Sequence, residues 1–137
     1  VFELTQSNRI IKDDCYGITL RIMRDEDYGS YVAFHKRNEA VAGICPEGTK
    51  ILLMFYYGAL IGAFAMLGKG ELAHLLIDRD YRGRGFGTIL GAIATFLAGE
   101  DGHQVWTQYR NREVYAKLYA ELGYRQAELI EMEKAIA

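Results

Sequence analysis

The chain has 137 residues, half of them hydrophobic and a quarter charged, which is enough for one domain around a single core. This composition is typical of a folded globular protein and excludes an intrinsically disordered chain. Because the formal net charge is -2, we expect no binding to nucleic acid or to an anionic membrane surface.

Cysteine usage and hydropathy bear on the compartment and on metal binding. Cys15 and Cys45 have neither a CxxC partner nor a histidine at zinc-ligand spacing, so they predict reduced thiols rather than a disulfide or a metal site. The longest apolar stretch, residues 51–67, is interrupted by Gly58 and Gly62 and is shorter than a membrane-spanning helix. We therefore expect a cytoplasmic protein without a metal ion or a membrane segment.

The first third of the chain predicts strands on either side of one helix. Residues 2–11, within an extra N-terminal segment 1–14, predict one strand, and residues 16–23 predict another. A helix is expected from Asp25 to about Arg37, because acidic residues favour a helix N-terminus. The side chains expected on its buried face are Tyr28, Tyr31, Val32 and His35. Residues 40–49 predict a loop.

The rest of the chain predicts an antiparallel meander followed by alternating helices and strands. The three meander strands are expected at residues 50–57, 59–67 and 71–77. Helices at 88–98 and before Gly123 are separated by a strand at 105–109, and residues 124–136 predict one or two closing strands. The apolar helix faces are expected to be Ile89, Ile93, Phe96 and Leu97, and then Tyr115, Leu118, Tyr119 and Leu122. This order predicts an α/β fold, with a mixed sheet and helices packed on both of its faces.

The loop after the third meander strand is rich in glycine and arginine, with the sequence Arg82-Gly83-Arg84-Gly85-Phe86-Gly87. The first turn of the helix that follows carries backbone N–H groups without an intrahelical acceptor, and the helix dipole is positive there. Glycines let the backbone approach an anion closely, and arginines add positive charge at its edge. The loop therefore predicts a site for a diphosphate group.

Two other phosphate-binding motifs are excluded at this loop. A P-loop needs Lys followed by Ser or Thr after its last glycine, and no such GK[ST] tripeptide occurs in the sequence. A dinucleotide-binding GxGxxG would need a glycine in place of Thr88 and would follow the first strand of a βαβ unit. For the loop taken alone, a tight strand-to-helix connection with surface arginines is the remaining alternative.

Around this loop the sequence resembles the GNAT superfamily of acyl-CoA-dependent N-acetyltransferases. Residues 78–87 are similar to the family's V-x-P-x-Y-R-G-x-G-x-G, with Arg79 where proline is usual. Residues 118–124, Leu-Tyr-Ala-Glu-Leu-Gly-Tyr, resemble its L-Y-x-x-L-G-[F/Y], and residues 131–134 resemble its closing strand. The resemblance extends from about residue 16 to the C-terminus. Two motifs in the right order and at the right separation are far more specific than either alone.

The resemblance implies one N-acyltransferase domain over residues 1–137, with a GNAT-like fold in which the central sheet is splayed beside the strand before the loop. Residues 24–49 are then the acceptor-side helix and loop. Residues 71–98 are the pyrophosphate-binding strand, loop and helix, and residues 105–124 contain the second motif.

The resemblance also implies that an acetyl group passes from acetyl-CoA, the co-substrate, to a primary amine by direct attack. The pantetheine arm is expected to pair with backbone groups of residues 75–77, whose side chains belong to the core. Asn111 stands one residue before the family's usual asparagine position, and capping a helix is its alternative role. The expected cofactor-binding residues are Leu75, Leu76, Ile77, Arg82, Gly83, Arg84, Gly85, Phe86, Gly87, Thr88, Asn111 and Tyr119.

The chemistry requires a base and an acid, because most amines are protonated at pH 7 and a thiolate leaves. The resemblance implies that Tyr119 protonates the leaving thiolate, the alternative being core packing. Glu71 is the expected base, unless it is a solvated turn carboxylate. His74 is an alternative base, since its pKa suits proton transfer, and strand alternation predicts that it lies on the opposite face from Glu71.

The sequence leaves the acceptor open among peptide N-termini, lysines, polyamines, aminoglycosides and other small amines. Residues 24–49 have room for one helix where the family usually has two, which predicts an open acceptor groove or one completed by a second copy of the chain in a homodimer. An alternative function from another class is a non-catalytic acyl-CoA-binding sensor or interaction module of the same fold.

Overall fold

The computed structural model describes residues 3–5, 10–13, 17–40, 49–68, 71–97, 103–107, 113, 115–126 and 131–135. Side chains are described for residues 17–40, 49–67, 71–97, 106, 113, 115–118 and 120–124. The predictions for Cys15, Cys45 and Asn111 fall outside the described residues, as does the side chain of Tyr119. None of the helices in the described part of the chain is long and apolar enough to cross a bilayer.

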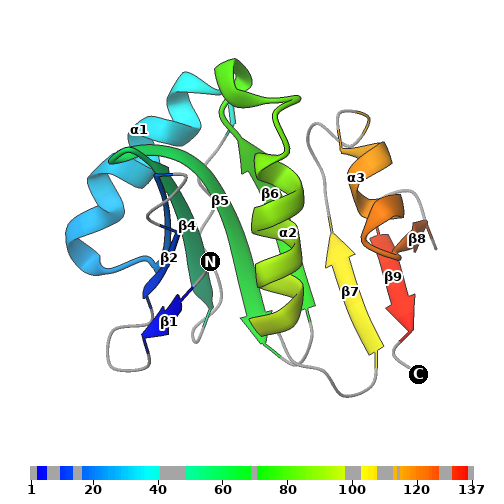
Figure 1. Cartoon of the computed structure of the whole chain (residues 1–137). Helices are drawn as coiled ribbons and strands as arrows, with labels where there is room; N and C mark the ends of the chain where they lie inside the picture. The colour runs from blue at the N-terminus through cyan, green and yellow to red at the C-terminus, as the bar shows by residue number, and fades with distance from the viewer. Residues whose placement is uncertain are drawn as a thin grey trace.

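The strands of the described residues form a single mixed sheet. They are β1 (Glu3–Thr5), β2 (Ile10–Asp13), β3 (Ile18–Ile22), β4 (Lys50–Tyr56), β5 (Ala59–Gly68), β6 (Glu71–Ile77), β7 (His103–Thr107), β8 (Arg125–Gln126) and β9 (Glu131–Ala135). Their order in space is β1-β2-β3-β4-β5-β6-β7-β9-β8, and only β6 and β7 run parallel. The predicted meander of β4, β5 and β6 is confirmed, and the sheet runs across the molecule in Figure 1.

Helices cover both faces of this sheet, as the fold-class prediction requires. They are α1 (Tyr28–Arg37), α2 (Phe86–Leu97) and α3 (Ala116–Glu121), with short 3₁₀ turns at Asp25–Asp27 and Arg79–Tyr81. On one face a cluster that includes Leu52, Phe64 and Trp106 packs against α2 and α3. On the other face a smaller cluster, including Leu53 and Ala63, packs against α1. Figure 1 shows α2 lying over β6 and α1 on the far side of the sheet.

One local prediction was wrong, and two were right only in part. The single strand predicted for residues 2–11 is the hairpin of β1 and β2, in which Leu4 pairs with Ile11. On α1 the buried face contains Phe34, whereas Tyr28 is 57% exposed. On α2 the predicted Ile89, Ile93 and Leu97 are partly buried against the core, and the buried residues are Phe86, Leu90, Gly91 and Ala94. The predicted Phe96 is 62% exposed, because small residues let the helix approach its neighbours closely and shift the buried stripe.

A β-bulge in β6 changes which residues face α1. Ala63 pairs with Leu76 and Ala65 pairs with Ala73, so three steps along β6 match two steps along β5. The extra residue is His74, whose φ of 58° lies in the left-handed region that few residues with a side chain adopt. The bulge lies next to Ala73, which with Thr107 forms the last pair between β6 and β7.

Candidate functional site

The loop that joins β6 to α2 is shaped by two glycines. Gly83 and Gly85 have φ values of 78° and 88°, which glycine adopts without steric cost. A Cβ atom at either position would meet no atom within 4 Å, so the space beside the loop is open. The amide of Ile89 bonds to the carbonyl oxygen of Gly85 at 3.2 Å, so the amides of residues 86–88 lie in the first turn, which has no intrahelical acceptors. These amides form the kind of helix N-terminus that binds anions.

A pocket of about 220 Å³ opens beside this loop and joins the end of β6, the start of α2 and the start of α3. The predicted cofactor-binding residues that line it are Ile77, Arg82, Gly83, Gly85, Gly87 and Thr88. The lining residues that sequence reasoning did not assign to the site are Tyr115, Lys117, Leu118 and Glu121. The structure therefore brings two segments together that are more than 25 residues apart in the chain.

The backbone of Ile77 is bonded by side chains on the edge of β6 that faces away from β5. The Ile77 amide donates to the Tyr115 hydroxyl at 2.8 Å, and the Ile77 carbonyl accepts from Arg82 Nε at 2.9 Å. Tyr115 is 4% exposed, and burial raises the pKa of its hydroxyl although the bond from Ile77 and the charge of Arg82 oppose this. The hydroxyl is therefore protonated at neutral pH. Tyr115 fills the place beside β6 that a neighbouring strand would otherwise take.

The direction of the backbone along β6 bears on the predicted contacts of residues 75–77. Amides alternate in direction along a strand, and the Asp78 amide bonds to Ile61 of β5 at 2.8 Å. The Ile77 amide therefore points away from β5, Leu75 shares its direction, and the Leu76 amide points toward β5. The cofactor contacts of these three residues stay predictions, and the direction of the backbone favours Leu75 and Ile77 for them. All three side chains are buried in the core, as expected.

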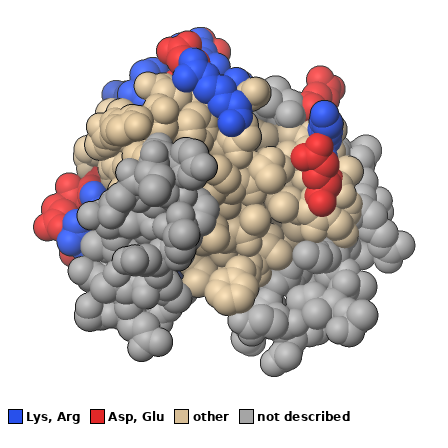
Figure 2. Space-filling model, viewed as in Figure 1, with Lys and Arg blue, Asp and Glu red and all other residues tan. Residues whose placement is uncertain are grey.

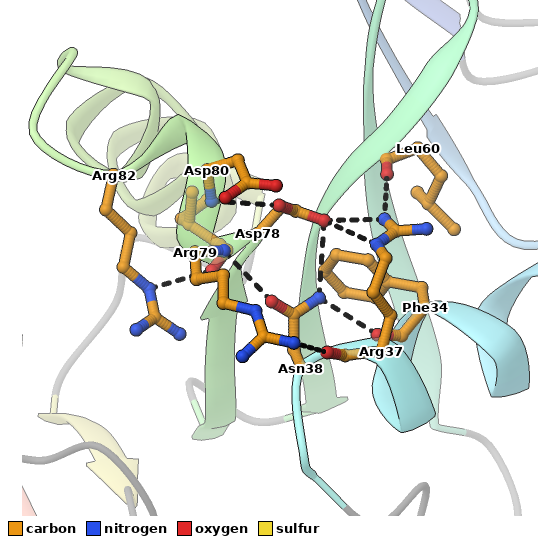
Figure 3. A network of polar contacts seen from close by, with 9 residues as sticks. Phe34, Arg37, Asn38, Leu60, Asp78, Arg79, Asp80 and Arg82 are labelled. Atoms are coloured by element: carbon orange, nitrogen blue, oxygen red, sulfur yellow. Dashed lines mark hydrogen bonds and ion pairs between the residues drawn. The ribbon is translucent and has the colours of Figure 1, made fainter.

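A buried polar network fixes the turn that precedes the loop (Figure 3). Asp78, which is 3% exposed, accepts from Arg37 Nε at 2.8 Å and from the Asp80 amide at 3.0 Å. The Asn38 amide group donates to Asp78 at 3.4 Å, and its oxygen accepts from the Arg79 backbone at 2.9 Å. The end of α1 is thereby tied to the start of the glycine-rich loop.

The network keeps Asp78 ionised although it is buried. Burial raises the pKa of this carboxyl, but the hydrogen bonds from the Asp80 amide, Arg37 and Asn38 outweigh it and hold the pKa below its ordinary value. The guanidinium of Arg37 also donates to the Leu60 carbonyl at 3.2 Å, which places it against β5. A carboxylate held by this many donors is a rigid anchor for the turn at Arg79–Tyr81.

Two predicted loop residues do not line the pocket with their side chains. The Arg84 guanidinium lies 5.2 Å from the centre of the Tyr81 ring and is exposed. The Phe86 ring packs 4.9 Å from the centre of the Tyr56 ring, within the core. Phe86 therefore contributes its backbone to the helix N-terminus, and its side chain anchors that helix on the sheet.

The candidate bases lie at different points along β6. Glu71 is the exposed first residue of the strand and pairs with Gly68 and Val105. His74 stands at the bulge. Leu72 belongs to the cluster under α2 and Ala73 to the cluster under α1, so alternation places Glu71 on the α1 face.

His74 lies on this same face, because its charge is one of the two causes that lower the pKa of His35 on α1. The prediction that Glu71 and His74 occupy opposite faces was wrong, because the bulge inserts one residue between them.

Basic side chains gather around the loop. Figure 2 shows Lys and Arg at the upper edge of the molecule, where Figure 1 has the connection from β6 to α2, and a band of both charges near α3. On α3, Lys117 and Glu121 form an i,i+4 pair at 3.9 Å.

The sequence signal that could have revealed Tyr115 is its place on the predicted apolar helix face, since a buried tyrosine hydroxyl needs a hydrogen-bond partner.

Comparison with known proteins agrees with this architecture. Residues 21–136 match a family model described as the acetyltransferase (GNAT) domain. The chain belongs to the GNAT acetyltransferase family. Membership places it among acyl-CoA-dependent acyltransferases, and the glycine-rich loop with the start of α2 is the segment in which the sequence resembles the family's pyrophosphate-binding motif.

Solved structures of GNAT proteins share the fold. The ribosomal-protein-S18-alanine N-acetyltransferase of Escherichia coli has a TM-score of 0.70 at 15% identity, covering 88% of this chain and 94% of that one. The PaiA N-acetyltransferase of Thermoplasma acidophilum, in complex with coenzyme A, has a TM-score of 0.68 at 17% identity, covering 86% and 98%. No curated protein matches this sequence closely enough to count as a relative.

Proposed function

We propose that this GNAT domain transfers an acetyl group from acetyl-CoA to a primary amine by direct attack of the amine nitrogen. The observation that carries the proposal is the pocket between the glycine-rich loop and the α3 segment. It combines an anion-binding helix N-terminus with a strand edge whose hydrogen-bonding groups point into the same space. Few ligands need both a diphosphate site and a strand-like partner, and coenzyme A is one.

The residues present fit coenzyme A at both of these points. The positive φ of Gly83 and Gly85 and the open space above them leave room for a diphosphate against the amides of the first turn of α2. Arg82 adds a guanidinium that already lies beside Ile77. The backbone of Ile77 offers an amide and a carbonyl to a pantetheine arm in place of Tyr115 and Arg82. When bound, acetyl-CoA supplies the activated acetyl group.

The acid that protonates the departing thiolate is Tyr119 in this proposal. Its backbone lies within α3, which flanks the pocket through Lys117, Leu118 and Glu121. A phenol hydroxyl donates a proton readily to a thiolate only when it is close and aligned, so Tyr119→Phe is expected to slow turnover while leaving acetyl-CoA binding nearly unchanged. Unchanged turnover would remove Tyr119 from the mechanism.

The proposal is tested by following thiol release from acetyl-CoA in the presence of a panel of amines. Two similar structures are named for acetylating an alanine of a ribosomal protein, so a peptide with an N-terminal alanine belongs in the panel beside lysine, a polyamine and small alkylamines. An α-amino group is neutral at pH 7 more often than a lysine, which favours it as an acceptor. Mass spectrometry of the products then identifies the acceptor class.

Two other functions, the non-catalytic sensor and a nucleotide-binding domain, would give different results in the same experiments. A non-catalytic sensor would bind acetyl-CoA in calorimetry and release no thiol with any amine. A nucleotide-binding domain would be stabilised against heat by ATP or NAD and not by acetyl-CoA, which would contradict the proposed function altogether.

A further inference from the structure

The bulge of β6 places one histidine where the paired part of the strand ends. Strands β6 and β7 pair from Glu71 to Ala73, and His74 follows directly. Three residues further on, the edge of β6 is bonded by Tyr115 rather than by a strand. Among the described residues, no strand pairs with this edge of β6 beyond Ala73. His74 therefore stands at the inner end of the edge along which the proposed function lays the pantetheine arm, close to where its thioester would come to rest.

A second histidine lies behind His74 on α1. His35 is 6% exposed, and its ring packs edge-on against Tyr31 with 4.5 Å between the ring centres. Within the described part of the chain, His35 Nδ1 is a buried polar atom without a hydrogen-bond partner. Burial and the charge of His74 together lower the pKa of His35 to about 4, so its ring is neutral at pH 7.

The electrostatics of the pair decide which histidine can take up a proton. Burial is the larger cause of the low pKa of His35, and the charge of His74 adds to it, so of the two rings His74 takes the proton first. His74 is exposed to solvent, whereas His35 is covered. Burial of the part of His74 that lies against the sheet lowers its pKa below the ordinary 6.5, so its ring is also mostly neutral at pH 7. A neutral, solvent-reached imidazole is able to accept a proton.

We propose that His74 is the general base that takes a proton from the acceptor amine. The uncharged ring of His35 leaves His74 without a second positive charge beside it. This rests on the proposed acetyl transfer. The ammonium form of the acceptor gives one proton to His74, which passes it to water. The neutral amine nitrogen then forms the bond to the acetyl carbon, and the carbon–sulfur bond breaks. Tyr119, the acid of the proposed function, gives its proton to the sulfur, and the second amine proton restores the Tyr119 hydroxyl.

Position favours His74 over Glu71 for this role. The two residues share the α1 face, but a strand rises about 3.3 Å per residue, so Glu71 lies roughly 10 Å back along β6. Glu71 also lies within the part of β6 that is paired with β7. Next to His74, α1 contributes His35, whose pKa the charge of His74 lowers, and β5 contributes the uncharged Ala63 and Ala65, whose pairs lie on either side of the bulge.

The test compares His74→Asn with Glu71→Gln in the acetyl-CoA assay. Asparagine tolerates the positive φ of the bulge, so His74→Asn removes the imidazole with little backbone strain, which urea unfolding checks. Loss of a general base slows proton removal by about 100-fold or more. We expect this loss with ethylamine, which is protonated at pH 7, and a much smaller one with methoxyamine, which is already neutral. We expect the fall in wild-type kcat/KM below pH 6.5 to disappear in His74→Asn and to persist in Glu71→Gln.

Rescue gives a second, independent readout. Glycine also fits the φ of 58°, so His74→Gly leaves a space that added imidazole can enter and in which it restores the rate. The proposal is overturned if His74→Asn slows both nucleophiles equally, if imidazole fails to rescue His74→Gly, or if Glu71→Gln alone removes the acidic fall in rate. Wild-type binding and turnover of acetyl-CoA are measured alongside, so that a failure of the proposed function itself is seen separately.

Discussion

The hydroxyl of Tyr115 accepts a hydrogen bond from the amide of Ile77 at 2.8 Å, so a side chain next to α3 occupies the strand edge where the coenzyme arm is proposed to bind. The same edge is bonded at the Ile77 carbonyl by Arg82. Binding of the arm would replace two intramolecular bonds with two intermolecular ones. This relationship links the stability of the free protein to its affinity for acetyl-CoA.

Tyr115→Phe is expected to destabilise the free protein and to increase the stability that it gains when acetyl-CoA binds. The ring is kept, but the buried Ile77 amide loses its partner, which costs about 1–3 kcal/mol. A bound pantetheine arm would supply a new partner, so the added stability from acetyl-CoA should be larger than in the wild type. Urea unfolding with and without acetyl-CoA measures both quantities. An equal ligand-induced gain in the two proteins would show that the arm does not use this amide.

Asp78→Asn is expected to loosen the loop and to lower stability in a pH-dependent way. Asparagine cannot replace the ion pair with Arg37, which is about half exposed, so we expect a loss of about 1–2 kcal/mol at pH 7 and weaker acetyl-CoA binding. The folded pKa of Asp78 is lowered from 3.8, so its contribution is present above pH 3.8 and is lost as pH falls through the folded pKa. The gap between wild type and variant should therefore close in acid. Asp25→Asn, at an exposed aspartate, is the matched control.

Substitutions at Gly85 separate backbone strain from electrostatic repulsion. Gly85→Ala strains a φ of 88° and is expected to cost about 1–2 kcal/mol of stability, with open space around the new methyl group. Gly85→Asp carries the same strain and adds a negative charge where a diphosphate is proposed to bind. Calorimetry should therefore show acetyl-CoA binding reduced in Gly85→Ala and absent in Gly85→Asp. Equal affinities in the two variants would argue against an anion at this position.

His35 is expected to make the protein less stable as pH falls below 6.5. Its pKa is 6.5 when unfolded and about 4 when folded, so the folded state binds fewer protons between these values and stability decreases as the unfolded chain takes up protons. The loss approaches about 3 kcal/mol near pH 4 at most. His35→Phe, which keeps an aromatic ring beside Tyr31, should flatten this decline in urea unfolding measured from pH 7 to pH 4.5. An unchanged slope would mean that His35 is not desolvated in solution.

Local sequence was sufficient for most of the architecture. Strand β6 was predicted with its observed bounds, and β4 and β5 to within one residue, because apolar runs of β-forming residues are separated by glycine turns. Helix α2 begins at Phe86, two residues before the predicted start, because the last two residues of the glycine motif already have helical conformation. These elements rest on short-range preferences, and short-range preferences are visible in a single sequence.

The predictions that were wrong concern features that depend on contacts between segments distant in the sequence. The bulge at His74 depends on how β5 and β6 are matched, and a one-residue shift moves the side chain to the other face. The buried stripe of α2 was set by close contacts, since a Cβ at Gly91 would lie 2.7 Å from Leu122. Neither contact has a signature in the local pattern of hydrophobic residues.

The sequence by itself determined the family, the order of strands and helices, and the glycine-rich loop, because each follows from residue types at short spacing. Only the tertiary structure decided that Tyr115 and Arg82 cap Ile77, that Arg37 and Asn38 anchor the loop through Asp78, and that His74 faces His35 across the α1 side of the sheet. The physical reason is that these are pairings between segments distant in the chain, which packing brings together and which no local preference specifies.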